Sequence, residues 1–223
     1  MKIIKFWQWP NGLLWKIILP RMHKSRQKRY ALFIKTLNPQ KSDKILDVGV
    51  GEGFETALNF LEEWYPYSRN ITALGLEDLP SFKKKYPSIQ YIKGDGRKLP
   101  FKNKSFDIYF SNAVLEHVGY FEQQKKFIKE ACRVAPKVFI STPNRWFPID
   151  LHTLIPLAHF FPEKIRSCIY HFFGKHFYAL EEHLRLTHVG EIKKMLPKNV
   201  KLKVYPQKFL GMTINLNLVI TRK

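Results

Sequence analysis

The segment KILDVGVGEGFET, residues 44–56, decides the fold of this chain. It begins with a short apolar run that is typical of a buried strand. Gly49, Gly51 and Gly53 follow, and glycines allow a backbone to turn tightly and to approach a ligand closely. A helix beginning near Phe54 would then present unpaired N–H groups to a bound molecule. The segment therefore predicts a strand, a ligand-binding loop and a helix in succession.

The spacing of the three glycines indicates which class of ligand the loop binds. A dinucleotide fingerprint reads G-x-G-x-x-G, and its third glycine would stand where this sequence has Phe54. The spacing here is G-x-G-x-G, and the acidic residue Asp47 precedes it. We therefore do not expect this loop to bind NAD.

Apolar runs and longer amphipathic stretches alternate from residue 44 to residue 142. Such alternation predicts a mostly parallel sheet with helices on both faces. The expected strands are 44–48, 71–76, 89–93, 106–111 and 137–142, followed by 200–205 and 216–221. The expected helices are 54–64, 79–86, 120–134 and 187–196. The sequence thus predicts one α/β domain over residues 44–223, built on a seven-stranded sheet.

Residues 143–183 interrupt this alternation, directly after the fifth expected strand. The stretch is rich in aromatic residues, histidine and proline. We expect an aromatic insertion packed over the carboxyl ends of the strands, which is where open α/β sheets bind their ligands.

The positive charge of the chain lies in its flanks. The formal net charge is +20, of which +10 falls in residues 1–44, +2 in 45–144 and +8 in 145–223. Clustered positive charge favours an anionic partner, either nucleic acid or an acidic membrane surface. A generally basic, solvated surface is the alternative.

The N-terminal segment, residues 1–43, is basic and aromatic, and it is expected to stand apart from the domain. Its longest uncharged stretch is too short and too polar for a transmembrane helix, and no signal-peptide cleavage site follows it. We expect it to lie on an anionic membrane surface, with apolar side chains inserted and basic ones facing the lipid headgroups. The basic residues concerned are Lys2, Lys5, Lys16, Arg21, Lys24, Arg26, Lys28 and Arg29.

The two cysteines, Cys132 and Cys168, are too few for a disulfide framework and match no metal-binding motif. We therefore expect no metal site. A reducing cytoplasm is the expected location, with the protein peripheral to the inner face of the membrane.

Four motifs follow one another in a familiar order: the D-x-G-x-G-x-G loop from Asp47, an acidic residue (Glu77) closing the second strand, KGDGRKLPF from residue 93, and FDIYFSNAVLEHV from residue 106. In this order the sequence resembles the class I S-adenosylmethionine-dependent methyltransferases. It looks most like the subgroup that acts on small molecules and lipids, which often carries a T-P-N such as residues 142–144. The resemblance covers about residues 44–144 and implies a Rossmann-like fold.

The resemblance also implies S-adenosylmethionine as the cofactor and assigns residues to it. Glu77 would accept the ribose hydroxyls, and Asp95 the adenine amino group. The glycine loop would surround the methionine portion, which Asp47 would help to hold, and Asn112 would line the pocket. The full expected cofactor-binding set is Asp47, Gly49, Gly51, Gly53, Glu77, Asp95, Gly96 and Asn112. Ordinary turn chemistry at strand ends is the alternative for the acidic residues.

Methyl transfer to a hydroxyl or an acidic carbon benefits from a general base, and histidine suits that task at neutral pH. His117, in the LEHV motif, and His152, in the insertion, are the candidates. A structural role for His117 and simple packing for His152 are the alternatives.

The expected function is an enzyme that methylates a small-molecule or lipid-linked acceptor. A methyltransferase that acts on RNA through the basic flanks is the second hypothesis. A non-catalytic binding protein of the same fold is the third, and the intact glycine loop argues against it.

Overall fold

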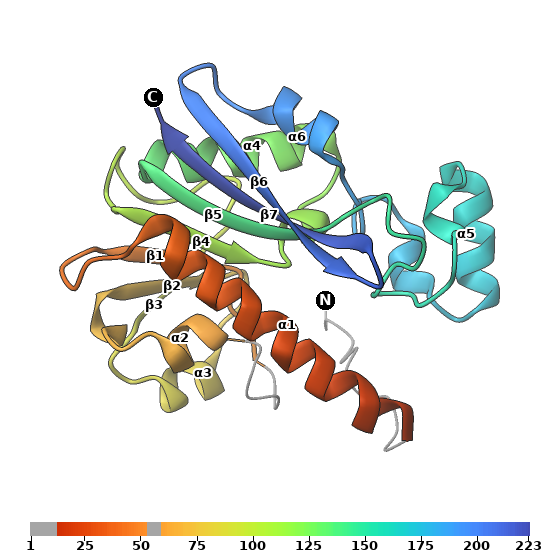
Figure 1. Cartoon of the computed structure of the whole chain (residues 1–223), viewed down its shortest axis with the longest axis horizontal. Coiled ribbons are helices and arrows are strands. Elements are labelled where there is room, and N and C mark those ends of the chain that lie inside the picture. Colours follow the sequence, from red (N-terminus) through yellow and green to blue (C-terminus); the bar gives the residue numbers. More distant parts are fainter. Residues whose placement is uncertain (1–12, 53–58) are drawn as a thin grey trace.

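A seven-stranded sheet forms the centre of the structure (Figure 1). The structure is a computed structural model that describes residues 13–52 and 59–223. The strand order is β3-β2-β1-β4-β5-β7-β6. The strands are β1 (Ile45–Val48), β2 (Ile71–Gly75), β3 (Gln90–Lys93), β4 (Ile108–Asn112), β5 (Lys137–Pro143), β6 (Val200–Phe209) and β7 (Met212–Arg222). Strands β1 to β5 pair in parallel, and β7 runs antiparallel to both its neighbours. The prediction of a mostly parallel, seven-stranded sheet is therefore confirmed.

Helices cover both faces of this sheet (Figure 1). They are α1 (Leu13–Leu37), α2 (Phe60–Trp64), α3 (Pro80–Lys85), α4 (Phe121–Val134), α5 (Glu163–Phe172) and α6 (Val189–Met195). One apolar layer lies between the sheet and α1, α2 and α3, and includes Phe33, Phe60 and Phe82. The other lies under α4 and α6 and includes Phe127 and Ile192. The sheet is thus buried on both sides, which explains why β1 is a continuous apolar run broken only by Asp47.

The expected elements are close to the observed ones, and two of them differ in extent. Strands β6 and β7 extend about four residues further toward each other than expected and form a long hairpin that turns at Leu210 and Gly211, both with positive φ. The helix expected over 54–64 is described from Phe60 onward, and residues 53–58 lie outside the described part of the chain.

Helix α1 was not expected from the sequence. Its second half packs on the sheet, with Phe33 fully buried and Leu37 nearly so. Arg26, one of the residues expected on a membrane, is also buried, at 7% exposed. The boundary between residues 43 and 44 stays a prediction, but the end of the first segment contributes to the apolar core. Among the described residues, none of the helices is long and apolar enough to cross a membrane.

The insertion between β5 and α6 forms a small layer of its own. It contains α5 and two short 3-10 helices, η3 (Ala158–Phe160) and η4 (His176–Ala179). Its core is made by Ala158, Tyr170, Tyr178, Ala179, Leu184 and Leu186. In Figure 1 the insertion lies beyond the carboxyl end of β5. The insertion is therefore positioned beside the carboxyl ends of the parallel strands.

Candidate active site

A pocket opens where the direction of the strand order changes, between β1 and β4. From β1 the chain continues to β2 and β3 on one side, whereas β4 and β5 lie on the other. Open α/β sheets bind ligands at such a switch point, outside the carboxyl ends of the strands. The pocket is lined by Asp47, Gly49, Val50, Asn59, Phe60, Leu61, Phe110 and Asn112. Three residues of the expected cofactor set, Asp47, Gly49 and Asn112, are therefore brought together here.

The glycine loop has a geometry that other residues could not adopt. Gly49 has φ of +103°, and a Cβ atom there would lie 2.1 Å from the Val114 side chain. Gly51 is held by the side chain of Asn59, which donates to the Gly51 carbonyl at 2.9 Å and accepts from its N–H at 3.3 Å. The expected cofactor residue Gly53 lies outside the described residues. The part of the loop that is described is thus a narrow, fixed turn at the pocket wall.

A second carboxylate accompanies Asp47 beneath the pocket. Asp47 is 6% exposed, and Glu62 on α2 is 4% exposed. Burial raises the pKa of Asp47, and the nearby Glu62 raises it further. Burial also raises the pKa of Glu62, to about 7. Two carboxyl groups this close disfavour double ionisation, so the pair retains a proton near neutral pH. Glu62 could not be predicted from the sequence, because it lies on α2, outside the glycine motif, and no motif marks it.

Glu77 and Asp95 follow β2 and β3 on the same edge of the sheet. Glu77 is exposed, and within the described part of the chain its carboxylate has no hydrogen-bond or ion-pair partner. The Asp95 carboxylate is bound by the Arg97 guanidinium at 2.8–3.0 Å. Burial would raise the pKa of Asp95, but the hydrogen bonds from Arg97 outweigh it and lower the pKa. Both side chains are thus available as anionic acceptors, and Arg97 fixes the position of Asp95.

Gly96 has a packing role in this structure. A Cβ atom on it would lie 2.5 Å from the Phe127 ring and 2.9 Å from Val48. The absence of a side chain therefore lets the loop after β3 sit on the core below it. Its expected contact with the cofactor stays a prediction.

Asn112 connects the pocket to helix α1. Its amide oxygen accepts a 2.5 Å hydrogen bond from the Arg29 guanidinium, and Arg29 also donates to the Ser25 hydroxyl. Burial lowers the pKa of Arg29 to about 10, and the nearby Arg26 contributes in the same direction. The sequence analysis had placed Arg29 among the membrane-facing residues, whereas it points into the site. The signal that could have located it is the spacing Arg26, Arg29, Phe33, Leu37, which puts these side chains on one helical face.

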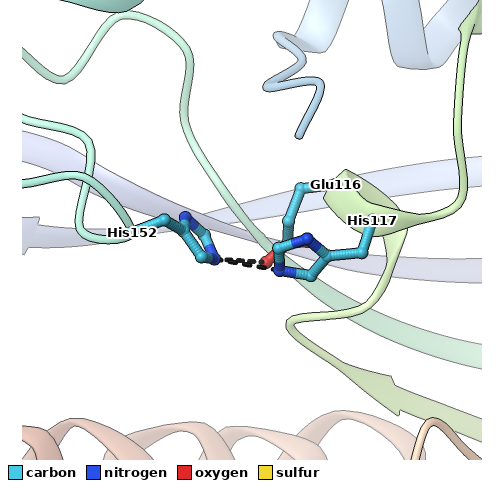
Figure 2. Close-up of side chains that lie close together, drawn as sticks. All are labelled: Glu116, His117 and His152. Carbon is cyan, nitrogen blue, oxygen red and sulfur yellow. Dashed lines mark hydrogen bonds and ion pairs between the residues drawn. The ribbon is translucent and has the colours of Figure 1, made fainter. Parts of the chain in front are cut away.

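The two expected general bases, His117 and His152, lie side by side (Figure 2). His117 ends the short helix η2 (Leu115–His117), which follows β4, and His152 comes from the insertion. Their Nε2 atoms are 3.0 Å apart, and their rings are nearly perpendicular. The buried carboxylate of Glu116 is also near, with Oε1 3.9 Å from His152 Nε2. The structure therefore joins residues that are far apart in the sequence into one cluster.

Each of these histidines is oriented through its other nitrogen. His152 Nδ1 lies 2.8 Å from the Asp150 carboxylate, and His117 Nδ1 lies 2.9 Å from the His183 carbonyl oxygen. Burial lowers the pKa of His152, but the hydrogen bond and charge of Asp150 outweigh it and raise the pKa. Burial and the proximity of His152 lower the pKa of His117. In both rings Nδ1 is thus the donor, and Nε2 points into the cluster.

Comparison with known proteins agrees with this architecture. A family model described as a methyltransferase domain matches residues 46–137. A probable S-adenosylmethionine-dependent methyltransferase of Mycobacterium tuberculosis is 24% identical over 124 residues, which cover 53% of this chain and 42% of that protein. The match thus spans less than half the length of this curated relative.

Solved structures show the same fold over most of the chain. A Pyrococcus horikoshii protein aligns with a TM-score of 0.61 at 18% identity, covering 90% of this chain and 91% of its own. The magnesium protoporphyrin IX methyltransferase of Synechocystis, solved with bound SAH, aligns with a TM-score of 0.60 at 14% identity. That alignment covers 96% of this chain and 90% of the Synechocystis protein. At these identities the likeness concerns the fold.

Proposed function

We propose that this chain is a class I S-adenosylmethionine-dependent methyltransferase that transfers a methyl group from that cofactor to a small-molecule or lipid-linked acceptor. The observation that carries the proposal is the pocket at the β1–β4 switch point. Asp47 lies near the end of β1, Glu77 follows β2 and Asp95 follows β3, so three carboxyl groups lie along the edge that contains it.

The residues on this edge fit the parts of the cofactor. The free carboxylate of Glu77 is suited to two ribose hydroxyls, and the fixed carboxylate of Asp95 to an amino group. The narrow turn at Gly49 leaves backbone at the pocket wall, and Asp47 beside it offers a carboxyl oxygen as hydrogen-bond acceptor to the amino end of the methionine portion. When bound, the cofactor supplies an electrophilic methyl group on a sulfonium ion.

The acceptor side is formed by segments outside the four motifs. Helix α1 contributes Arg29, and the insertion contributes His152, so both meet the end of β4. Methyl transfer needs an acceptor atom held in line at about 3 Å and shielded from water, which such a cover would provide. The name of the Synechocystis neighbour, which acts on a porphyrin, supports an acceptor of small-molecule size.

The proposal is tested by calorimetry and an acceptor screen. We expect S-adenosylmethionine and its demethylated product to bind with micromolar affinity and NAD not to bind. Incubation with methyl-labelled cofactor should then label a compound in a small-molecule or lipid extract and should not label RNA. Binding of NAD without the sulfonium compound would refute the methyltransferase, and labelling of RNA alone would refute the acceptor class.

A lipid-linked acceptor would place the basic N-terminal segment at an anionic membrane surface. Arg26 and Arg29 face the domain, but Lys24 and Lys28 are exposed on α1. Each basic residue near such a surface contributes about 1 kcal/mol, so Lys24→Gln with Lys28→Gln should weaken vesicle binding about 30-fold. The measurement is sedimentation with vesicles containing anionic lipid.

The matched control neutralises two exposed lysines on β6, Lys201 and Lys203, and should change vesicle binding less. Equal losses in the two double variants would mean that overall charge governs attachment and that α1 has no specific part in it. Absence of vesicle binding by the unaltered protein would refute the membrane location.

A further inference from the structure

Three potential metal ligands converge where η2 meets the insertion (Figure 2). Glu116, His117 and His152 each offer one ligand atom, and these atoms all lie within 4.8 Å of one another. We propose that this cluster binds a divalent transition-metal ion of the zinc type. The cysteines predict no metal site, and the 35 residues between His117 and His152 match no metal-binding motif either.

The hydrogen bonds of the two histidines leave both Nε2 atoms available as ligands. His117 Nδ1 must donate to the His183 carbonyl, since a carbonyl oxygen can only accept. His152 Nδ1 donates in the same way to the ionised Asp150 carboxylate. In neutral imidazoles the two Nε2 lone pairs would then face each other at 3.0 Å, which is repulsive. Either an extra proton or a cation between the nitrogens removes this repulsion.

Glu116 distinguishes between the proton and the metal ion. Its side chain is fully buried, and Oε2 accepts a hydrogen bond from the Thr142 hydroxyl at 3.0 Å. Oε1 is buried too, and has no hydrogen-bond partner among the described residues. A proton shared by the histidines would leave that oxygen 3.9 Å from His152 Nε2 and without a hydrogen bond, whereas a metal ion would be coordinated by it. Burying an unsatisfied carboxylate oxygen is costly, so the arrangement favours the ion.

The distances fit a metal ion without large movements. Zinc binds imidazole nitrogen and carboxylate oxygen at about 2.0–2.2 Å, which in a tetrahedral site places ligand atoms about 3.4 Å apart. The separations are 3.0 Å between the Nε2 atoms and 3.9 Å between His152 Nε2 and Glu116 Oε1, and no pair of ligand atoms is more than 4.8 Å apart. Rearrangements of about 0.5–1.5 Å would therefore complete the site.

The surroundings supply the supporting hydrogen bonds that metal-binding histidines ordinarily have. Such ligands donate their second N–H to a carboxylate or a backbone carbonyl, which fixes the ring. Asp150 and the His183 carbonyl are in these positions. Asp150 is itself held by the backbone N–H and the hydroxyl of Thr153, at 3.0 and 2.9 Å.

Arg29 is the nearby positive charge that would oppose a metal ion. It is close enough to interact electrostatically with Glu116, but its guanidinium donates to Asn112 and Ser25. It therefore leaves the coordinating oxygen of Glu116 free. The carboxylates of Glu116 and Asp150 balance the charge of a divalent ion at the site.

Three protein ligands leave one position of a tetrahedral ion open, as in catalytic zinc sites. Glu116 and His117 lie four and five residues after Asn112, which lines the cofactor pocket, so we place this position on the acceptor side. A hydroxyl or carboxylate oxygen of the acceptor could bind there, and the ion would favour loss of the hydroxyl proton. This role rests on the proposed methyl transfer, whereas the binding of the ion does not.

The test measures metal binding directly. The protein is stripped with a chelator and titrated with Zn²⁺ against a chromophoric competitor, and with Co²⁺ followed by its visible absorption. We expect one ion per chain, with a cobalt spectrum of low coordination number. His152→Ala and Glu116→Gln should each weaken zinc binding more than 100-fold, and Asp150→Asn should weaken it about 10–100-fold.

The matched control is His171→Ala. His171 and His176 form a second pair of neighbouring rings, 5.0 Å apart, on the exposed part of the insertion. The control should leave the stoichiometry and affinity unchanged. Failure of the stripped, folded protein to bind zinc, or equal losses in the control and in His152→Ala, would overturn the proposal. Calorimetry with S-adenosylmethionine on Glu116→Gln separates this outcome from failure of the cofactor site, because cofactor binding should persist.

Discussion

The buried pair Asp47–Glu62 should make the stability of this protein depend on pH. In the unfolded chain Glu62 has the ordinary glutamate pKa of 4.5, whereas in the folded protein burial raises it to about 7. Between these two values the folded state holds more protons than the unfolded state. Stability is therefore full below about pH 4.5 and falls as the pH rises toward 7.

The size of the effect follows from the same two values. A pKa difference of this magnitude corresponds to about 3 kcal/mol, at about 1.36 kcal/mol for each pH unit. Solvent screens the Glu62 carboxylate very little, because the residue is only 4% exposed. Asp47 contributes with the same sign, since its pKa is also raised. Replacement by glutamine removes the ionisation at position 62, so Glu62→Gln should be more stable than the unaltered protein at pH 8 by up to about 3 kcal/mol.

Urea denaturation of both proteins at pH 5, 6, 7 and 8 measures this difference. The free energies of unfolding should be similar at pH 5 and should diverge as the pH rises. Glu63→Gln is the control, because this neighbouring side chain is exposed and pairs with Lys85. A difference between Glu62→Gln and the unaltered protein that is constant with pH would refute the reasoning.

Three further predictions concern the edge of the sheet. Gly49→Ala should destabilise the protein by about 2–5 kcal/mol in urea denaturation, because φ is positive there and the added Cβ would clash with Val114. Unchanged stability would contradict this loop geometry. Glu77→Ala should weaken S-adenosylmethionine by about 1.5–3 kcal/mol in calorimetry, while its exposed neighbour Asp78→Ala should not; equal effects would remove Glu77 from the cofactor site. A double-mutant cycle in urea denaturation between Arg29→Met and Asn112→Ala should give a coupling of about 1.5–3 kcal/mol, and additive effects would show that the contact is incidental.

The sheet could be predicted from the sequence because its signals are local. Each inner strand is a short apolar run, because a strand buried on both faces consists almost entirely of apolar residues. Helix α1 could not be predicted in the same way, because its packing depends on a few residues such as Phe33 in a basic stretch. The hairpin β6–β7 was predicted too short because its outer end is exposed and mixes polar with apolar residues, so hydrophobicity alone did not indicate a strand there.

The cofactor half of the site was predictable for a related reason. Parallel strands end at one edge, so residues directly after β1, β2 and β3 must lie near one another. No comparable rule of sheet topology places the residues of the acceptor half. Arg29 meets Asn112 across 83 residues of sequence, and His152 meets His117 across 35. Only the folded chain reveals these contacts.

The division of the site into a cofactor half and an acceptor half guides the search for the acceptor. The four motifs determine where a methyl donor binds, but they are shared with proteins whose acceptors differ, and the fold alone does not fix the reaction. Residues outside these motifs, from α1 and the insertion, reach the region after β4. Arg29 provides positive charge there, and with the proposed ion bound the cluster of Glu116, His117 and His152 would bind an oxygen-bearing group. An acceptor with an ionisable oxygen near its methylation site satisfies both, and acceptor screens should begin with phenols, acidic hydroxy compounds and carboxylates.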